Sequence, residues 1–196
     1  MGTPDFSVPA LKNLAERDEF EILMVVTQPD RPKGRGKKLA FSPVKQAALD
    51  LGLELYQPET LKDNSAVQKL SALSPNFFVV AAFGQILTKQ VLSIPSRSPI
   101  NIHASLLPKY RGASPIQAAI LNMDNVTGIT TMVMAEKMDA GDILRQDTTP
   151  IHENDTAQTL HDRLGTIGGS LIVDTILQII DKRLTPTPQD HSGATY

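Results

Sequence analysis

Two side chains that could act on a carbonyl group lie two residues apart within residues 100–112. Asn101 can donate an amide N–H to a developing negative charge, and His103 can bind or release a proton near neutral pH. If residues 99–103 form a β-strand, its two-residue period directs both side chains to one face, where they could converge on one reacting atom. The Ser-Leu-Leu-Pro sequence that follows cannot continue the strand, so His103 would lie at its carboxyl end, where open α/β sheets bind ligands.

The residue types alone also permit a structural explanation. Asn101 could cap a turn, His103 could be a hydrogen-bonded core histidine, and Asp139 could simply begin a turn that contains glycine. Asn, His and Asp are common at strand ends, where the chain leaves regular structure. The residue types therefore leave both explanations open, and the surrounding sequence must decide between them.

The elements around this segment alternate between helix and strand. Apolar residues at helical spacing predict helices over residues 8–16, 43–52, 61–73, 115–122 and 156–181. Short apolar or alternating runs predict strands over residues 21–27, 53–56, 77–83, 99–103 and 128–134. Ser42, and either Asp155 or Thr156, are expected to cap the helices that follow them. This alternation predicts an α/β fold with a mostly parallel sheet and helices on both faces.

The composition fits one globular domain of 196 residues. With 41% apolar residues, 20% charged residues and a net charge of −2, the chain is neither disordered nor a broad nucleic-acid coat, so any RNA contact must be local. Since there is no cysteine, disulfides and thiolate metal sites are excluded. No uninterrupted apolar run approaches the roughly 18 residues of a membrane helix. We expect the domain to span residues 1–188, with residues 189–196 beginning a linker.

A basic segment follows the strand predicted at residues 21–27. Proline and glycine at positions 32, 34 and 36 disfavour a helix there and predict a flexible loop. Such a loop suits phosphates and unpaired bases, because it can become ordered on binding. On composition alone, a solvated loop without a partner is the favoured alternative. The candidate RNA-binding residues are Arg31, Lys33, Arg35, Lys37 and Lys38.

The central motif resembles the folate-dependent formyltransferase family. Asn101-x-His103 followed by Ser-Leu-Leu-Pro-Lys-Tyr-Arg-Gly is similar to the catalytic motif of that family, and Asp139 matches the family's aspartate, with Asp142 as its neighbour. The resemblance implies a Rossmann-like formyltransferase fold and a catalytic set of Asn101, His103 and Asp139. Asn101 would stabilise an oxyanion, His103 would assist there or in proton transfer, and Asp139 would bias the imidazole and hold a relaying water. No metal is required.

Further motifs resemble the methionyl-tRNA formyltransferases within that family. They lie at residues 2–6, 27–39, 42–45 and 81–87, with Pro-Gln-Asp at residues 188–190. The resemblance implies formyl transfer from 10-formyltetrahydrofolate to the amino group of methionyl initiator tRNA, in the initiation of translation. It also implies a cytoplasmic monomer, bacterial or organellar, that has no membrane partner. The basic loop would enter the acceptor arm of the tRNA, with Arg35 at the key position.

The same resemblance implies a folate site made of three segments, in which backbone groups dominate. For any one side chain there, packing and ligand contact are equally open. The expected residues are Ser105, Leu106, Leu107, Pro108, Phe83, Gly84, Gln85, Ile86, Leu87, Glu136, Lys137 and Met138.

The sequence departs from the family pattern at both ends. Family members have an apolar strand just before the Gly-Thr-Pro-Asp-Phe segment and a small β-barrel domain after the catalytic domain, and we expect this chain to lack both. Three alternatives therefore stay open. They are formylation of a sugar amine or nucleotide, hydrolysis of the folate donor by water, and binding of folate or tRNA with little turnover.

Overall fold

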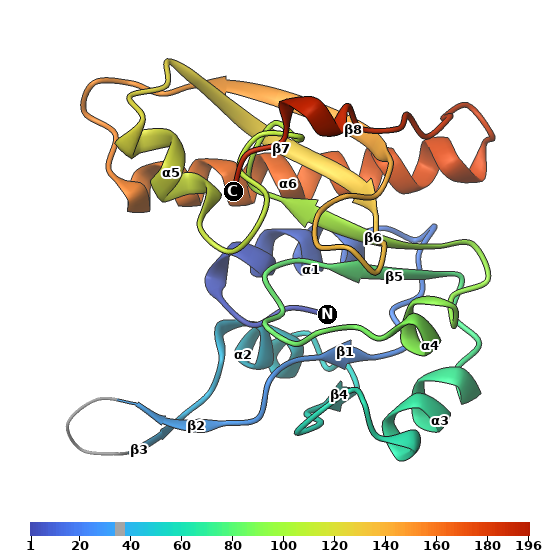
Figure 1. Cartoon of the computed structure of the whole chain (residues 1–196). Coiled ribbons are helices and arrows are strands. Elements are labelled where there is room, and N and C mark those ends of the chain that lie inside the picture. Colours follow the sequence, from blue (N-terminus) through green and yellow to red (C-terminus); the bar gives the residue numbers. More distant parts are fainter. Residues whose placement is uncertain (34–37) are drawn as a thin grey trace.

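The computed structural model describes the backbone of residues 1–33 and 38–196, a body of strands with helices on both sides (Figure 1). The helices are α1 (Val8–Ala15), α2 (Pro43–Asp50), α3 (Asn64–Ala72), α4 (Lys89–Leu92), α5 (Pro115–Leu121) and α6 (Ala157–Ile180), with 3-10 turns η1 (Asp5–Ser7) and η2 (His191–Gly193). The strands are β1 (Val25–Val26), β2 (Arg31–Lys33), β3 (Lys38–Ala40), β4 (Leu55–Tyr56), β5 (Phe77–Val80), β6 (Ser98–His103), β7 (Val126–Val133) and β8 (Ile143–Pro150).

The longest sheet is four-stranded, in the order β5-β6-β7-β8. β5 and β6 are parallel, whereas β6–β7 and β7–β8 are antiparallel. β1 and β4 form a separate parallel pair. The predicted α/β class is confirmed, with parallel pairing in β1–β4 and β5–β6 and antiparallel pairing at the β7–β8 edge of the large sheet.

The first two residues join β1 to β5, and the amino terminus lies between these strands in Figure 1. The Gly2 N–H donates to the Val26 carbonyl at 3.0 Å, the Met1 amino group donates to the Val79 carbonyl at 2.7 Å, and the Ala81 N–H donates to the Met1 carbonyl at 3.0 Å. Residues 1–2 therefore continue the hydrogen-bonding pattern of a parallel sheet between two strands that do not pair with each other directly.

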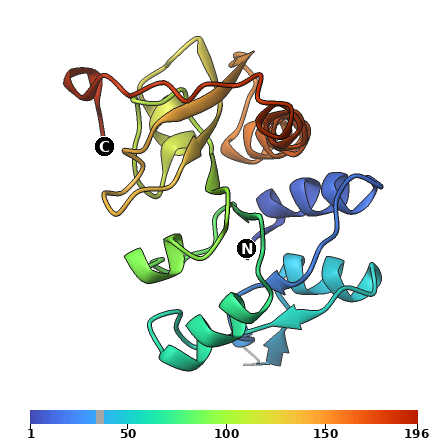
Figure 2. The same ribbon diagram turned by 90° about the vertical axis from the view of Figure 1, so that its right-hand side faces the viewer.

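The helices cover both sides of the strands. α1, α2 and α6 lie on one side, and α3 and α4 lie on the other (Figure 2). The predicted caps are present, because the Ser42 hydroxyl accepts from the Lys45 N–H at 3.1 Å and Thr156 forms a capping box with Thr159. By length and composition alone, α6 could cross a membrane. The sequence analysis considered uninterrupted apolar runs and did not identify this helix. Its buried face, which includes Leu164 and Ile172, packs in the main core, as in the core helix of a globular domain.

The basic segment contains paired strands where the sequence predicted a loop. β2 and β3 form an antiparallel hairpin that extends from the body of the molecule (Figure 1). Arg35 and Lys37 lie outside the described residues, as do the side chains of Lys33 and Lys38. The hairpin places Arg31 on an exposed strand that leads away from the domain.

One further helix, α4, and one further strand, β8, were not predicted from the sequence. α4 is a single turn capped by the Thr88 hydroxyl, too short to show helical periodicity. β8 pairs along most of its length with β7, yet its polar residues Arg145-Gln146-Asp147 break the apolar alternation because that part of the strand is largely solvent-exposed. One turn of helix and a polar strand both lack the apolar periodicity on which the sequence predictions were based.

Candidate active site

The carboxyl end of β6 carries the first two candidate residues, as predicted. Asn101 is half-buried and His103 is 6% exposed, with both side chains on the same face of the strand. The His103 Nε2 atom lies 2.8 Å from the Tyr110 carbonyl oxygen. A carbonyl can only accept, so Nε2 carries the hydrogen. The Nδ1 atom is therefore the nitrogen left to exchange a proton.

Asp139 meets both residues from the turn after β7. Its Oδ2 atom accepts from the Gly112 N–H at 2.8 Å and lies 3.7 Å from His103 Nδ1. Its Oδ1 atom lies 3.5 Å from Asn101 Nδ2. The structure thus brings together the three residues expected to be catalytic, which supports a functional origin for the cluster over three separate structural roles.

The turn that presents Asp139 has a restricted backbone. Asp139 has φ +49°, in the left-handed region that aspartate tolerates better than most residues. Two residues later, a Cβ atom at Gly141 would lie 1.9 Å from the Val133 carbonyl oxygen, so this position requires glycine. The Asp-Ala-Gly sequence therefore sets the local geometry that aims the Asp139 carboxylate at His103.

The loop after β6 supplies backbone partners that the sequence motif contained but to which no role had been assigned. Tyr110 provides the carbonyl for His103 and Gly112 provides the N–H for Asp139. The Tyr110 hydroxyl donates to Asp124 at 2.7 Å, which raises the pKa of the phenol. Tyr110 and Gly112 have φ of +55° and +100°, so the loop turns sharply. The same motif therefore carries both the reactive side chains and the backbone that orients them.

Residues 189–195, expected to begin a linker, fold back onto this loop. The Thr195 carbonyl accepts from the Arg111 N–H at 2.8 Å, and the Thr195 hydroxyl accepts from the Tyr110 N–H at 2.8 Å. Gln189 is 6% exposed. This segment packs with the domain, whereas the boundary at residue 188 stays a prediction.

The twelve residues expected at a folate site divide by burial. Phe83, Leu87, Ser105 and Leu107 are buried, and Ser105 donates its hydroxyl to the Lys109 carbonyl. Their side chains therefore serve packing and loop structure, so any contact with folate in those segments would come mainly from the backbone, as expected. Three of the twelve residues are half-buried, namely Leu106, Pro108 and Gln85. Five are exposed: Gly84, Ile86, Glu136, Lys137 and Met138.

Two exposed apolar side chains occur in these folate segments. Ile86 is 69% exposed and Met138 is 62% exposed. An ion pair of 3.5 Å joins Lys89, the first residue of α4, to Glu136 in the segment that carries Met138. These two side chains are thus exposed apolar groups on segments that follow β5 and β7. Contact with a folate at either residue stays a prediction.

The basic hairpin is tied to one of these loops at its base. Lys45 pairs with Asp30, and this hydrogen bond lowers the pKa of the Asp30 carboxyl. Gln57 donates to the Gln28 carbonyl at 2.8 Å, and the Gln28 amide donates to the Phe83 carbonyl at 3.1 Å. Through Gln28 the hairpin is therefore anchored beside the candidate folate segment, which places its exposed Arg31 on an arm that starts near the site.

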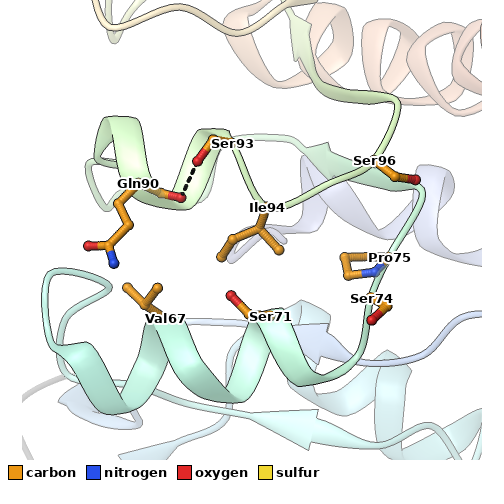
Figure 3. A pocket seen from close by; sticks show the side chains of 8 residues that line it. All are labelled: Val67, Ser71, Ser74, Pro75, Gln90, Ser93, Ile94 and Ser96. Atoms are coloured by element: carbon orange, nitrogen blue, oxygen red, sulfur yellow. Dashed lines mark hydrogen bonds between the residues drawn. The ribbon is translucent and has the colours of Figure 1, made fainter.

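A pocket of about 460 Å³ lies elsewhere, between α3 and α4 (Figure 3). Ser74 and Pro75 precede β5, whereas Ser93 and Ser96 precede β6, so this pocket is at the amino ends of the strands and the Asn101 cluster is at the opposite end. Its lining contains no ionisable side chain. The chemistry predicted from the sequence therefore belongs to the cluster and not to this pocket.

Comparisons with known proteins agree with this geometry. The family model described as Formyl transferase matches residues 1–176. The chain is 50% identical to the methionyl-tRNA formyltransferases of Thermodesulfovibrio yellowstonii, over 96% of this chain and 61% of that protein, and of Bacillus licheniformis, over 100% and 62%. It thus spans about three-fifths of the length of these relatives.

Solved structures show the same fold at lower identity. A phosphoribosylglycinamide formyltransferase from Bacillus halodurans superposes with a TM-score of 0.75 at 22% identity, covering 92% of this chain and 93% of that one. An N-formyltransferase from Helicobacter canadensis, in complex with folinic acid and dTDP-3-aminofucose, superposes with a TM-score of 0.73 at 22% identity, covering 100% and 68%. With the match of the family model over most of its length, the chain belongs to the formyl transferase family.

Proposed function

We propose that this chain transfers the formyl group of 10-formyltetrahydrofolate to the α-amino group of methionyl initiator tRNA, as the catalytic domain of an enzyme of translation initiation. The observation that carries this proposal is the convergence of Asn101, His103 and Asp139 at the carboxyl end of β6. Relatives that are 50% identical to the chain bear the name of this activity, which supports the choice of acceptor.

The reaction passes through a tetrahedral intermediate. The lone pair of the methionyl amine attacks the formyl carbon, so a C–N bond forms and negative charge develops on the formyl oxygen. Collapse of the intermediate breaks the bond from carbon to N10 of the folate, and the proton lost by the amine ends on N10. The site must therefore stabilise one oxyanion and move one proton, and the products are formyl-methionyl-tRNA and tetrahydrofolate.

The three side chains divide these tasks. Asn101 donates an N–H to the oxyanion, and His103 takes up the proton through Nδ1, since its Nε2–H is held by the Tyr110 carbonyl. Asp139 stabilises the charged imidazole and accepts from the water that relays the proton. These side chains and one water are enough to stabilise the oxyanion and to carry the proton from the amine to N10, so the proposed step uses no metal.

The two substrates approach from neighbouring surfaces. The reduced folate lies against the loops with Ile86 and Met138, and a related N-formyltransferase binds folinic acid. The acceptor arm of the tRNA contacts the basic hairpin, where Arg31 and the other four basic residues favour its phosphates. The protein acts as a cytoplasmic monomer in this proposal.

A formylation assay tests the proposal. The chain is incubated with 10-formyltetrahydrofolate and methionyl initiator tRNA, and formyl-methionine is measured after the ester bond to tRNA is hydrolysed. Uncharged tRNA and a His103→Ala variant serve as controls, and a parallel reaction offers an amino sugar nucleotide as acceptor. We expect product with methionyl-tRNA alone and its loss in the variant.

Other outcomes select among the alternatives. Formylation of the amino sugar nucleotide with methionyl-tRNA left unmodified would assign the chain to small-molecule acceptors. Formate release without formyl-methionine would indicate hydrolysis of the donor. Binding of folate and tRNA with neither product would refute catalysis by this chain and leave a binding domain.

A further inference from the structure

Gln189 lies at the junction of the two loops that form the site, and all its hydrogen-bonding atoms are engaged. Its amide N–H groups donate to the Asp139 carbonyl at 3.0 Å and to the Gly141 carbonyl at 2.6 Å. Its Oε1 atom accepts from Arg111 Nε at 3.2 Å and from Arg111 Nη2 at 2.7 Å. One buried amide therefore links the turn that carries Asp139 to the loop that carries Tyr110 and Gly112.

Arg111 makes this link costly to break. Its side chain is 3% exposed, and no carboxylate among the described residues lies within ion-pair distance of its guanidinium. Its recorded side-chain partners are neutral, namely Gln189 and His191, whose Nδ1 atom accepts from Nη2 at 2.8 Å. A buried cation without a counter-ion depends on its hydrogen bonds, so loss of the Gln189 carbonyl would drive Arg111 to a new position.

The residues bonded to Gln189 are themselves next to, or part of, the groups that contact His103 and Asp139, so a shift of either partner of Gln189 would displace these side chains. On one side, Arg111 lies between Tyr110, whose carbonyl holds His103 Nε2, and Gly112, whose N–H binds Asp139 Oδ2. On the other side, the backbone carbonyl of Asp139 accepts a hydrogen bond from the Gln189 amide. The hydrogen bond from the Gly112 N–H to Asp139 joins the same two loops directly, and Gln189 with Arg111 joins them a second time from the backbone side.

We propose that Gln189 is a positioning residue for the formyl transfer proposed above, holding the Asp139 carboxylate and the Tyr110–Gly112 loop in one geometry around His103. It touches no reacting atom. It acts by fixing which nitrogen of His103 carries the hydrogen and how far Asp139 lies from the other nitrogen. This role rests on the proposed function for its catalytic consequence, but its structural consequence can be measured without turnover.

Two substitutions separate the halves of the link. Gln189→Ala removes every contact, whereas Gln189→Glu keeps an acceptor for Arg111 and removes both donors to the Asp139 turn. Gln158→Ala is the matched control, because Gln158 is an exposed glutamine on α6 whose amide bonds only to Asp162. Far-UV circular dichroism and the thermal midpoint establish that each variant is folded, and Gln189→Glu keeps the assay informative if Gln189→Ala unfolds.

The first measurement is nitrogen NMR of the His103 ring together with hydrogen exchange of the Gly112 amide. We expect both Gln189 variants to shift the His103 ring nitrogens and to speed exchange at Gly112, and Gln158→Ala to change neither. In the formylation assay we expect kcat to fall about 10- to 100-fold in both variants with little change in KM for either substrate, since displacements near 1 Å have effects of that size.

The results distinguish the two proposals. Unchanged His103 signals and unchanged Gly112 exchange in folded variants would overturn the positioning role whatever the activity. Higher activity in the variants would also overturn the positioning role, because that result would mean that the carboxyl-terminal segment restricts access to His103. Altered NMR signals in the variants, together with no formyl-methionine from the unsubstituted chain, would instead support the link and refute the proposed function.

Discussion

The two halves of the sheet differ in how completely their strands are paired. β7 and β8 are eight residues each and pair along most of their length, and β6 joins them to β5 without a gap. β1 and β4 are two residues each, and backbone hydrogen bonds of Met1 and Gly2 connect β1 to the β5 segment. A cavity of about 550 Å³ lies between the two halves, lined in part by Ile22 and Phe77.

This difference matches the demands of the proposed chemistry. The cluster of Asn101, His103 and Asp139 rests on the fully paired half, where rigid strands hold reacting groups in place. The basic hairpin follows β1 and belongs to the other half, in which the strands are shorter, whereas the candidate folate segments follow β5, β6 and β7. The candidate reactive side chains thus lie on fully paired strands, whereas the hairpin proposed to contact tRNA lies on the less completely paired part of the molecule.

Core substitutions in the two halves should differ most in stability. Ile172 is fully buried in α6, and its replacement by alanine should lower the free energy of unfolding by about 2–5 kcal/mol. Ile22 is half-buried and lines the existing cavity, so Ile22→Ala should lower it by about 1 kcal/mol. Urea denaturation of both variants measures the difference. Equal losses would show that the cavity half is as tightly packed as the other.

The buried amino group should make the less paired half sensitive to pH. Burial lowers the pKa of the Met1 amino group from 8.0 to about 5. Between pH 5 and pH 8 the unfolded chain therefore binds a proton that the folded chain does not, so the free energy of unfolding should decrease as the pH falls from 8 to 5. Three pKa units correspond to at most about 4 kcal/mol, with no further change from this group below pH 5.

A chemical control isolates this contribution. Acetylation of the Met1 amino group removes its titration and leaves the amino-acid sequence unchanged. Denaturation at several pH values should give a steeper profile for the free amine than for the acetylated chain. Parallel profiles would mean that the amino group becomes solvated or that burial does not perturb it.

Asp139 should affect activity far more than stability. In Asp139→Asn the side chain keeps its size, and asparagine tolerates the positive φ of this position. The substitution removes the negative charge beside His103. We expect the formylation rate to fall about 10²- to 10³-fold with a small change in thermal midpoint. Asp142→Asn, in the same turn and exposed, is the matched control. A variant as active as the control would remove Asp139 from the mechanism.

Local sequence patterns were sufficient for elements whose stability is local. The period of two placed Asn101 and His103 on one face of β6, and polar caps at Ser42 and Thr156 marked the starts of α2 and α6. The grouping of Asp139 with them was foreseen through the family motif, because no local pattern brings together residues from β6 and a turn more than thirty positions later.

The remaining features depend on long-range contacts. β8 is a strand because β7 supplies its partner, although the residues Arg145-Gln146-Asp147 read as a polar segment. The link from Gln189 to Arg111 joins residues 78 positions apart, and the Pro-Gln-Asp motif that contains Gln189 gave no indication of its partner. The residues next to Gln189 and Arg111 in the sequence do not indicate this pairing, and it was identified from the structure.

The smallest expected effect concerns the exposed hairpin. Arg31 and Arg17 are both exposed arginines that lie 3.9 Å from a glutamate, Glu59 and Glu19 respectively. If the hairpin binds tRNA phosphates, Arg31→Ala should lower the slope of log K against log salt concentration by about 0.7 to 0.9, the value for one lost phosphate contact, whereas Arg17→Ala should leave it unchanged. Titration of methionyl-tRNA at several salt concentrations measures both. Equal slopes in the two variants would separate Arg31 from the tRNA and leave the less paired half of the sheet without evidence for its proposed role in holding the large substrate.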